Sequence, residues 1–430
     1  MEKKVEGIYD GFKELGTGKM MILGLQHVFA MFGATVLVPL LTGLSVSVTL
    51  FSAGIATIWF FFITKRKVPI FLGSSFAFLG AFASVANGDP ELLPYATGGV
   101  VCAGLVYVVL AALFAIFGPK KVMKLFPPVV TGPIIILIGL ILAPTAVSSA
   151  SGNWILAIIA IAIVICVNLF GKGMLKLIPI LCGILGAYVL GCLITLINPN
   201  FLGLSWIDFS NLKNVSILSV PPFFLPKFEI SAIVTFVVVS VAAIVEHIGD
   251  IAAIGATCGK NFIADPGLTR TLLGDGLGTS MAGAIGGPAN TTYSENTGVV
   301  ALTKVYDPKV MFIAACIAIL VSFISIFDAF INTIPWSIIG GISIVLYGMI
   351  SATGVRTIVV NNIDFTNMRN IIIMALILVC GLGFNSYPIM IPLGSATLQF
   401  GGLASAAIIG IIVNAILPGK DYEFKIDEIQ

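Results

Sequence analysis

Apolar runs of about 20 residues recur along the whole chain, separated by short clusters of Gly, Pro or charged residues. Runs of this length predict transmembrane helices, because about 20 residues span the hydrocarbon core of a bilayer. Fourteen segments are predicted, at 18–41, 46–64, 68–86, 95–117, 128–149, 153–170, 176–197, 229–252, 271–287, 288–304, 309–332, 334–353, 370–386 and 394–418. The pattern therefore predicts an all-α polytopic membrane protein.

Basic residues alternate between the connections of these segments. Four lysines lie before or at the start of the first segment, at positions 3, 4, 13 and 19. They place the N-terminus in the cytoplasm, because Lys and Arg are retained on that side. Basic residues then recur in every second connection, at Lys65–Lys67, Lys120, Lys121 and Lys124, Lys172 and Lys176, Lys260 and Arg270, Lys304 and Lys309, and Arg356 and Arg369. The opposite connections carry none, apart from two lysines in 198–228. Both termini are expected in the cytoplasm.

Composition agrees with this interpretation. Of the 430 residues, 58% are hydrophobic and only 10% are charged, whereas a soluble domain has about 25% charged residues. The net charge of +2 gives no indication of nucleic-acid binding. Residues 1–19 are polar and predict no cleavable signal peptide. The seven cysteines lie mostly singly in apolar runs, so we interpret them as small core residues rather than metal ligands or disulfides.

The one long connection, 198–228, falls midway between the seventh and eighth segments. Seven is an odd number, so two homologous halves would have opposite topology, as in the inverted repeats of many secondary transporters. We find no convincing internal sequence identity, and the 7+7 repeat is therefore inferred from topology alone.

The third and tenth segments are both interrupted by Pro, Gly and hydroxyl residues, in Val68–Phe78 and Gly286–Asn296. These residues disfavour a continuous helix. Paired breaks at matching positions of two halves indicate a binding site near the bilayer midplane, where free backbone groups become ligands. The alternative is two ordinary kinked helices whose hydroxyls bond their own backbone.

Two glutamates, Glu246 and Glu295, lie where a carboxylate costs about 2.5–3.5 kcal/mol to insert. Such groups usually face a cavity and have a function. Asp250 follows Glu246 by four residues, on the same helix face. Two nearby carboxylates in a medium of low dielectric constant resist ionising together, which suits a proton relay. Asp250 as a polar residue at a helix end is the alternative.

The remaining polar residues have secondary expected roles. His27, His247 and Asn296 are candidates for supporting the ligands rather than binding directly, whereas Asp275 and Asp328 are expected to be structural. Phe76 or Tyr293 could stack on a ring, and Tyr347 could reach the cavity. There is no HExxH and no Walker A sequence, and Ser74 and Ser75 lack a matching base, so we expect no enzyme, no metal and no cofactor. These features indicate an ion-coupled carrier of a small, polar, planar solute.

The chain resembles the nucleobase–ascorbate transporter family, and in particular its uracil-transporting bacterial members. The resemblance is carried by Gln26–Pro39, Leu72–Phe78, Glu246–Asp250 and Asn290–Gly298. It implies fourteen spans with short antiparallel strands in segments 3 and 10. It also implies a core domain at 1–117 and 229–333, and a gate domain with the outer loop at 118–228 and with the cytoplasmic tail at 334–430.

The resemblance also implies site residues. Glu246 and Glu295 would bind the ring N–H groups of the base, with Ser75, Phe76, Tyr293, Ser294 and Tyr347 around it. The chain has Asp250 where uracil-type members often have His and purine-type members commonly have Asp. This departure bears on both the substrate and the proton route.

We therefore predict a proton-coupled symporter that imports uracil across the plasma (inner) membrane by alternating access, with Glu246 and Asp250 in proton coupling. Its expected partners are uracil or a related nucleobase, protons, the lipid bilayer and a second copy in a homodimer, with no nucleic acid. A purine (xanthine or urate) symporter is the nearest alternative, an anion channel or exchanger is a second, and a membrane enzyme is a third.

Overall fold

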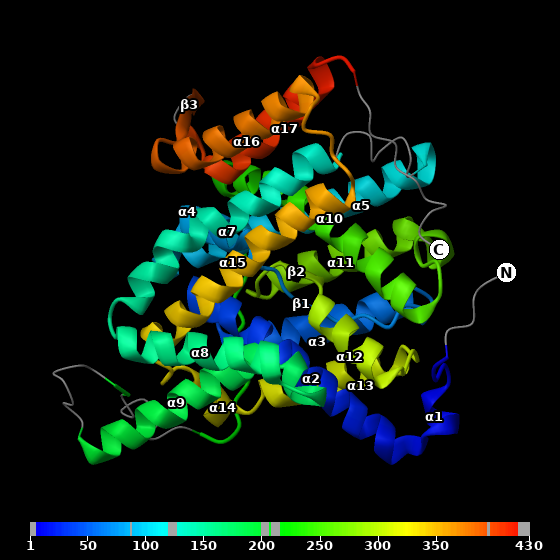
Figure 1. Ribbon diagram of the computed structural model, residues 1–430, viewed down its shortest axis with the longest axis vertical. Helices are drawn as coiled ribbons and strands as arrows, with labels where there is room; N and C mark the ends of the chain where they lie inside the picture. The colour runs from blue at the N-terminus through cyan, green and yellow to red at the C-terminus, as the bar shows by residue number, and fades with distance from the viewer. Residues whose placement is uncertain are drawn as a thin grey trace.

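The computed structural model describes residues 6–86, 88–118, 127–198, 206–207, 216–393 and 396–419. Three predicted features lie wholly or partly outside these residues. They are the basic cytoplasmic connection with Lys120, Lys121 and Lys124, the outer loop at 198–228, of which only a part is described, and the cytoplasmic tail at 420–430. The described part of the chain is mostly helical, with two short two-stranded sheets (Figure 1).

The first half contains α1 (Gly11–Glu14), α2 (Gly16–Thr42), α3 (Val46–Ile63), β1 (Leu72–Ser74), η1 (Phe76–Phe78), α4 (Leu79–Ala86), η2 (Pro90–Leu92), α5 (Leu93–Phe117), α7 (Pro128–Ala150), α8 (Trp154–Phe170), η3 (Gly173–Leu177) and α9 (Pro179–Ile197). The second half contains α10 (Ile230–Cys258), η6 (Ile263–Gly267), α11 (Leu268–Ala284), β2 (Asn290–Thr292), α12 (Ser294–Thr303), α13 (Lys309–Ser322), α14 (Ser325–Ile331), α15 (Trp336–Val360), α16 (Met368–Ser386), β3 (Ile389–Leu393), β4 (Ala396–Phe400) and α17 (Gly402–Ile416).

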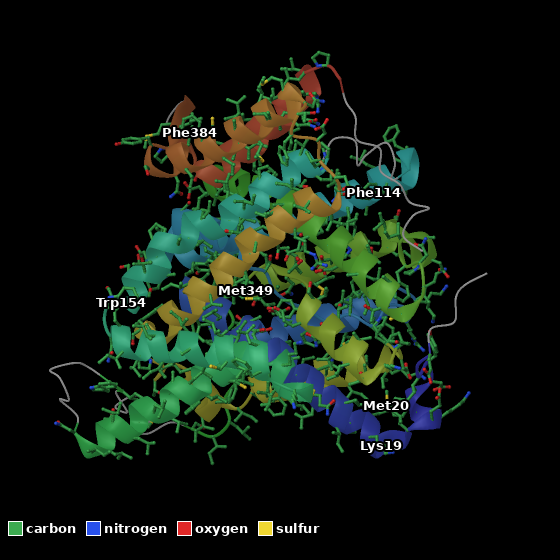
Figure 2. All side chains as sticks on the ribbon, viewed as in Figure 1. Lys19, Met20, Phe114, Trp154, Met349 and Phe384 are labelled. Carbon is green, nitrogen blue, oxygen red and sulfur yellow. The ribbon has the colours of Figure 1, made fainter. Side chains whose placement is uncertain are left out.

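Within the described residues, eight helices are long and apolar enough to cross a membrane: α2, α3, η2 with α5, α7, α9, α10, α15 and α16. Four further apolar helices are shorter, at Phe76–Ala86, Trp154–Phe170, Lys309–Ser322 and Gly402–Ile416. Many large apolar side chains are exposed on the outside, including Trp154 at the edge of the molecule in Figure 2. Such a surface is stable in lipid, and the chain is a multi-pass membrane protein.

Packing separates the described long helices into two groups. In one group, α11 lies against α3 and α5, α13 against α2 and α3, and α10 against α5. In the other, α15 runs beside α7 and α8, and α16 and α17 lie against each other and against α7 (Figure 1). Fewer contacts join the two groups, mainly those of α10 with α17 and α2 with α9.

Several predicted segments differ in detail from the observed elements. The prediction of a span at 394–418 is wrong at its beginning, because β3 pairs with β4 and α17 begins only at Gly402. Pro388, Pro392 and Gly394 disfavour a helix there. The predicted span at 309–332 is divided into α13 and α14. The weak segments 68–86 and 288–304 each consist of a short strand followed by a helix.

Candidate functional site

The third and tenth predicted segments meet in a two-stranded antiparallel sheet. β1 pairs with β2 so that Leu72 lies opposite Thr292 and Ser74 lies opposite Asn290. Two further backbone bonds extend the pairing, from Ser75 N to Ala289 O at 2.8 Å and from Tyr293 N to Phe71 O at 3.0 Å. Strands from opposite halves of the chain are thus joined in the interior.

Hydroxyl groups of neighbouring helices bond the backbone groups that this short sheet leaves free. Thr57 of α3 accepts from Leu72 N at 2.9 Å and donates to Leu72 O at 3.2 Å. Thr279 of α11 donates to Asn290 O at 3.0 Å. Non-helical backbone inside a membrane protein is stable only where such partners or a cavity satisfy it.

Glycine is required at position 73 because another side chain lies against its backbone. A Cβ at Gly73 would be 2.4 Å from Cζ of Tyr293. The Tyr293 hydroxyl donates to Ser74 O at 2.8 Å, and Thr35 Oγ1 of α2 lies 3.3 Å from it. Tyr293 is only 3% exposed, so this ring mainly joins β2 to β1 and α2.

A helix begins directly after each strand. η1 and α4 follow β1, and α12 follows β2. Neither Ser75 nor Tyr293, the residues before these helices, caps the first turn with its side chain. The first N–H groups of both helices therefore remain available as donors, and the helix dipoles give both N-termini a partial positive charge.

Three acidic residues surround β2 and the start of α12. Asp250 of α10 is buried and accepts hydrogen bonds from Thr292 at 2.7 Å and Ser294 at 2.6 Å. Glu246, one turn earlier, is exposed although the adjacent Val245 and His247 are not. Glu295 is partly exposed in the first turn of α12. Glu246 lies close enough to Asp250 and Glu295 for the three carboxyl groups to interact electrostatically.

Two buried polar pairs support these elements. Asn296 donates through Nδ2 to His27 O at 3.1 Å and lies 3.1 Å from His27 Nδ1, which joins α12 to α2. His247 Nδ1 lies 2.8 Å from Asp275 Oδ2, both side chains are fully buried, and the pair joins α10 to α11. The angles at this second contact depart from those of a well-formed hydrogen bond. His27, His247 and Asn296 thus connect the helices that carry the acidic residues to their neighbours.

The other predicted site residues lie in different surroundings. Ser75 is buried and its hydroxyl has no hydrogen-bond partner among the described residues, Phe76 is partly exposed, and Ser294 is exposed. Tyr347 is 2% exposed on α15, and no hydrogen bond among the described residues connects it to β1, β2 or α10. Ser75, Phe76 and Ser294 therefore adjoin the strand pair, whereas Tyr347 belongs to the other packing group.

Sequence reasoning missed several polar residues of the strand pair. Asn290 is fully buried, and neither atom of its side-chain amide has a hydrogen-bond partner among the described residues. A buried unpaired amide is rare in proteins and often marks a ligand site. Thr292 was not singled out either, although it bonds Asp250. The sequence signal that could have identified both residues is the run of polar residues at 290–292 inside an otherwise apolar region. No group of three His, Cys, Asp or Glu residues in the described part could hold a metal.

Comparisons with known proteins identify relatives of this chain. The family model Xan_ur_permease, described as "Permease family", matches residues 18–390. A "Probable uracil permease" from Pasteurella multocida (strain Pm70) is 41% identical over 415 residues, which cover 94% of this chain and 95% of the relative. A "Uracil permease" from Bacillus caldolyticus is 39% identical over 419 residues, 94% of this chain and 93% of the relative.

The fold is also found in a solved structure of low sequence identity, "the transmembrane domain of a cyanobacterium bicarbonate transporter BicA". The two share 17% identity with a TM-score of 0.60, and the match covers 95% of this chain and 99% of that one. This similarity shows the fold alone. The family match and the relatives show more: this chain is a permease, not an enzyme, and belongs to the nucleobase–ascorbate transporter family.

Proposed function

We propose that the protein imports uracil together with protons. The observation that carries this proposal is the sheet of β1 and β2, with Glu246, Asp250 and Glu295 beside it in a membrane protein. Relatives at 39–41% identity that are named uracil permeases support the substrate. A broken, polar backbone between two apolar halves is the usual binding site of secondary transporters.

The chemistry of the site suits a pyrimidine base. Glu246 and Glu295 offer carboxylate oxygens to the ring N–H groups, and the first N–H groups of η1 and α12 donate to its carbonyls. Ser75, Phe76 and Ser294 adjoin the strands and line the base. Tyr293 and Tyr347 complete the proposed site, although Tyr293 contributes mainly by holding Gly73 and Ser74.

Proton coupling is assigned to Glu246 and Asp250. Glu246 is exposed and close to other acidic groups, so its protonation would change how it binds a ring N–H. Asp250 lies one turn away and accepts from two hydroxyls. A proton passing between them would alter both base binding and the position of β2. The proton gradient would supply the energy, without a cofactor.

The finer architecture is part of the same proposal. Fourteen spans would form two inverted sets of seven, with a core domain at 1–117 and 229–333 and a gate domain at 118–228 and 334–430. The two packing groups and the paired strand–helix breaks support this division. Alternating access would move the core against the gate. We place the protein in the plasma membrane, with both termini cytoplasmic and with a second copy as its partner.

The test is uptake of labelled uracil by proteoliposomes with and without an imposed pH gradient. The wild-type protein should accumulate uracil only with the gradient. Glu246→Gln should abolish accumulation, because the amide cannot take up and release the proton. Glu91→Gln, an exposed glutamate on η2, is the matched control and should transport normally. Uphill uptake by Glu246→Gln at the wild-type level would refute the coupling role.

A purine symporter is the second candidate, and Asp250 is the observation that favours it. Competition of labelled uracil with unlabelled uracil, xanthine and urate separates the two, because only the true substrate competes at low concentration. An anion exchanger is suggested by the BicA-like fold alone. Bicarbonate or chloride flux without any nucleobase would favour it, but the acidic residues beside the strands oppose an anion.

A further inference from the structure

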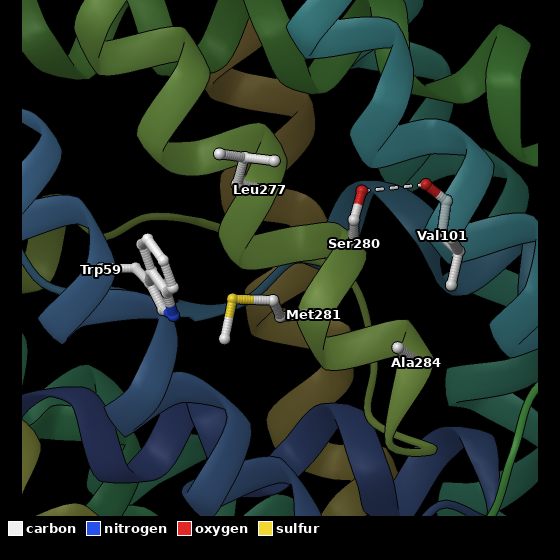
Figure 3. A pocket seen from close by; sticks show the side chains of 6 residues that line it. All are labelled: Trp59, Val101, Leu277, Ser280, Met281 and Ala284. Atoms are coloured by element: carbon white, nitrogen blue, oxygen red, sulfur yellow. Dashed lines mark hydrogen bonds between the residues drawn. The ribbon is translucent and has the colours of Figure 1, made fainter.

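A second concave site lies on the outside of the molecule, away from the strand pair. Helix α11 forms its floor, with α3 on one side and α5 on the other (Figure 3). The groove has a volume of about 320 Å³ and is lined by Trp59, Val101, Leu277, Ser280, Met281 and Ala284. Its lining residues are all at least partly exposed.

The groove surface is almost wholly apolar. The one hydroxyl in its lining, on Ser280, donates to Val101 O at 3.0 Å and is therefore already satisfied (Figure 3). Trp59 is 46% exposed, and Figure 3 shows its ring next to the side chain of Met281. A hydrocarbon chain fits this surface, because it requires no polar partner and gains contact with the indole and thioether.

One end of the groove carries a positive charge. Arg270 precedes Leu277 by two helical turns on α11, so it lies on the same face as Leu277, Met281 and Ala284. Its side chain is exposed, and Nη1 lies 3.4 Å from Ile63 O at the end of α3. The guanidinium is thereby held where α11 begins and α3 ends, at one end of the groove.

Further cations lie near this end. Lys65 and Arg66 follow α3 directly and are exposed, whereas Lys67 is paired with Asp265. The predicted membrane orientation places all of them at the cytoplasmic surface. The end of the groove is therefore complementary to an anionic group at the level of the lipid headgroups.

The spacing agrees with the dimensions of a lipid. At a rise of 1.5 Å per residue, Arg270 lies about 10 Å from Leu277 and about 21 Å from Ala284 along the helix. One leaflet contributes roughly 15 Å of hydrocarbon, half of a core about 30 Å thick. A headgroup at Arg270 would thus place its acyl chain beside Leu277 and Met281, and the chain would end about one helical turn before Ala284.

We propose that this groove is a specific site for an anionic phospholipid of the cytoplasmic leaflet. Arg270 binds the phosphate, Lys65 after the end of α3 adds positive charge, and Trp59, Leu277 and Met281 hold one acyl chain. Basic pockets between transmembrane helices on the cytoplasmic side bind such headgroups in other membrane proteins. The site lies on α11, which also bonds β2 through Thr279 and contacts His247 through Asp275. A bound lipid therefore braces the helix behind the strand pair.

The experiment measures lipid retention by the full-length protein in detergent, using native mass spectrometry with phosphatidylglycerol and phosphatidylcholine. The wild-type protein should retain phosphatidylglycerol better than phosphatidylcholine. Arg270→Gln should weaken phosphatidylglycerol retention roughly tenfold, because a charge-assisted contact is lost. Arg356→Gln, an exposed arginine on α15 away from the groove, should leave it unchanged.

A second variant tests the groove itself. Ala284→Phe should fill it and reduce the retention of both lipids, while thermal unfolding and uracil binding in calorimetry report whether the fold is intact. Equal effects of Arg270→Gln and Arg356→Gln would overturn the headgroup assignment, as would equal retention of the two lipids by the wild type. Unchanged retention by a folded Ala284→Phe variant would overturn the acyl-chain assignment.

Discussion

The two broken segments have the same backbone plan but differ in chemistry. β1 and β2 are each three residues long, and each is followed at once by a short helix. When the two segments are aligned on their strands, Ala77 in η1 occupies the position that Glu295 occupies in α12. Ala77 is 3% exposed in an apolar environment, whereas Glu295 is partly exposed among carboxylates.

The two segments therefore make different contributions to the proposed site. The third segment contributes backbone and a close-packed strand, in which Gly73 admits Tyr293. The tenth segment contributes backbone and charge, and Asp250 of α10 anchors it through two hydroxyls. The two segments thus share one backbone arrangement but differ in their charged residues. This is expected if one segment positions the substrate and the other recognises it and couples its binding to the proton.

The largest effect is expected where the asymmetry is removed. Glu295→Ala gives the tenth segment the residue type found in the third, and uracil should bind roughly 100-fold more weakly. This is about 2.8 kcal/mol, near the upper range for a hydrogen bond to a charged group. Isothermal titration calorimetry measures it, with Glu91→Ala as the control. Affinity within twofold of wild type would remove Glu295 from the ligand set.

A steric change in the third segment should come next. Gly73→Ala places a Cβ against the Tyr293 ring and should destabilise the protein by about 1–3 kcal/mol, as overpacking does. Thermal unfolding measures the loss. Gly80→Ala in α4 is the matched control, because a Cβ there meets nothing within 4 Å. If both variants unfold at the wild-type temperature, Gly73 is not needed for strand packing.

Removing one hydroxyl from the tenth segment should have a smaller effect. Thr292→Val leaves Asp250 without one of its two donors and should weaken uracil binding about tenfold, close to 1.4 kcal/mol. Thr257→Val, which loses only a bond within α10, should bind normally in the same titration. Equal affinities for the two variants would mean that Asp250 does not position β2.

The smallest effect is expected from the corresponding hydroxyl of the third segment. Ser74→Ala removes the neutral contacts of its hydroxyl with Thr35 O and with the Tyr293 hydroxyl, each at 3.2 Å, while the Tyr293 hydroxyl keeps its bond to the backbone of residue 74. The loss should be about 1 kcal/mol in chemical unfolding. Weaker uracil binding by Ser74→Ala than by Thr292→Val in the same titration would reverse the proposed division between the segments.

Much of this arrangement could be predicted from the sequence because each signal is local. The Pro, Gly and hydroxyl residues around Ser74 and Thr291 disfavour a helix wherever the chain runs. Glu246 and Glu295 are conspicuous because charge is costly in an apolar chain. The hairpin of β3 and β4 was missed, because the apolar character of 394–418 resembles that of a membrane helix.

The partners of these residues could not be predicted in the same way. Nothing in the spacing of residues 250, 292 and 294 specifies that Asp250 accepts from Thr292 and Ser294, since α10 and β2 are separated by α11. The pairing of Asn296 with His27 joins residues 269 positions apart. The amino-acid sequence by itself determined which segments are apolar enough to cross a membrane, which of them break and where the charges lie, because those depend on local transfer energies and backbone preferences. Only the tertiary structure decided which side chains meet and where α11 forms a groove, because close packing of distant helices is a property of the whole fold.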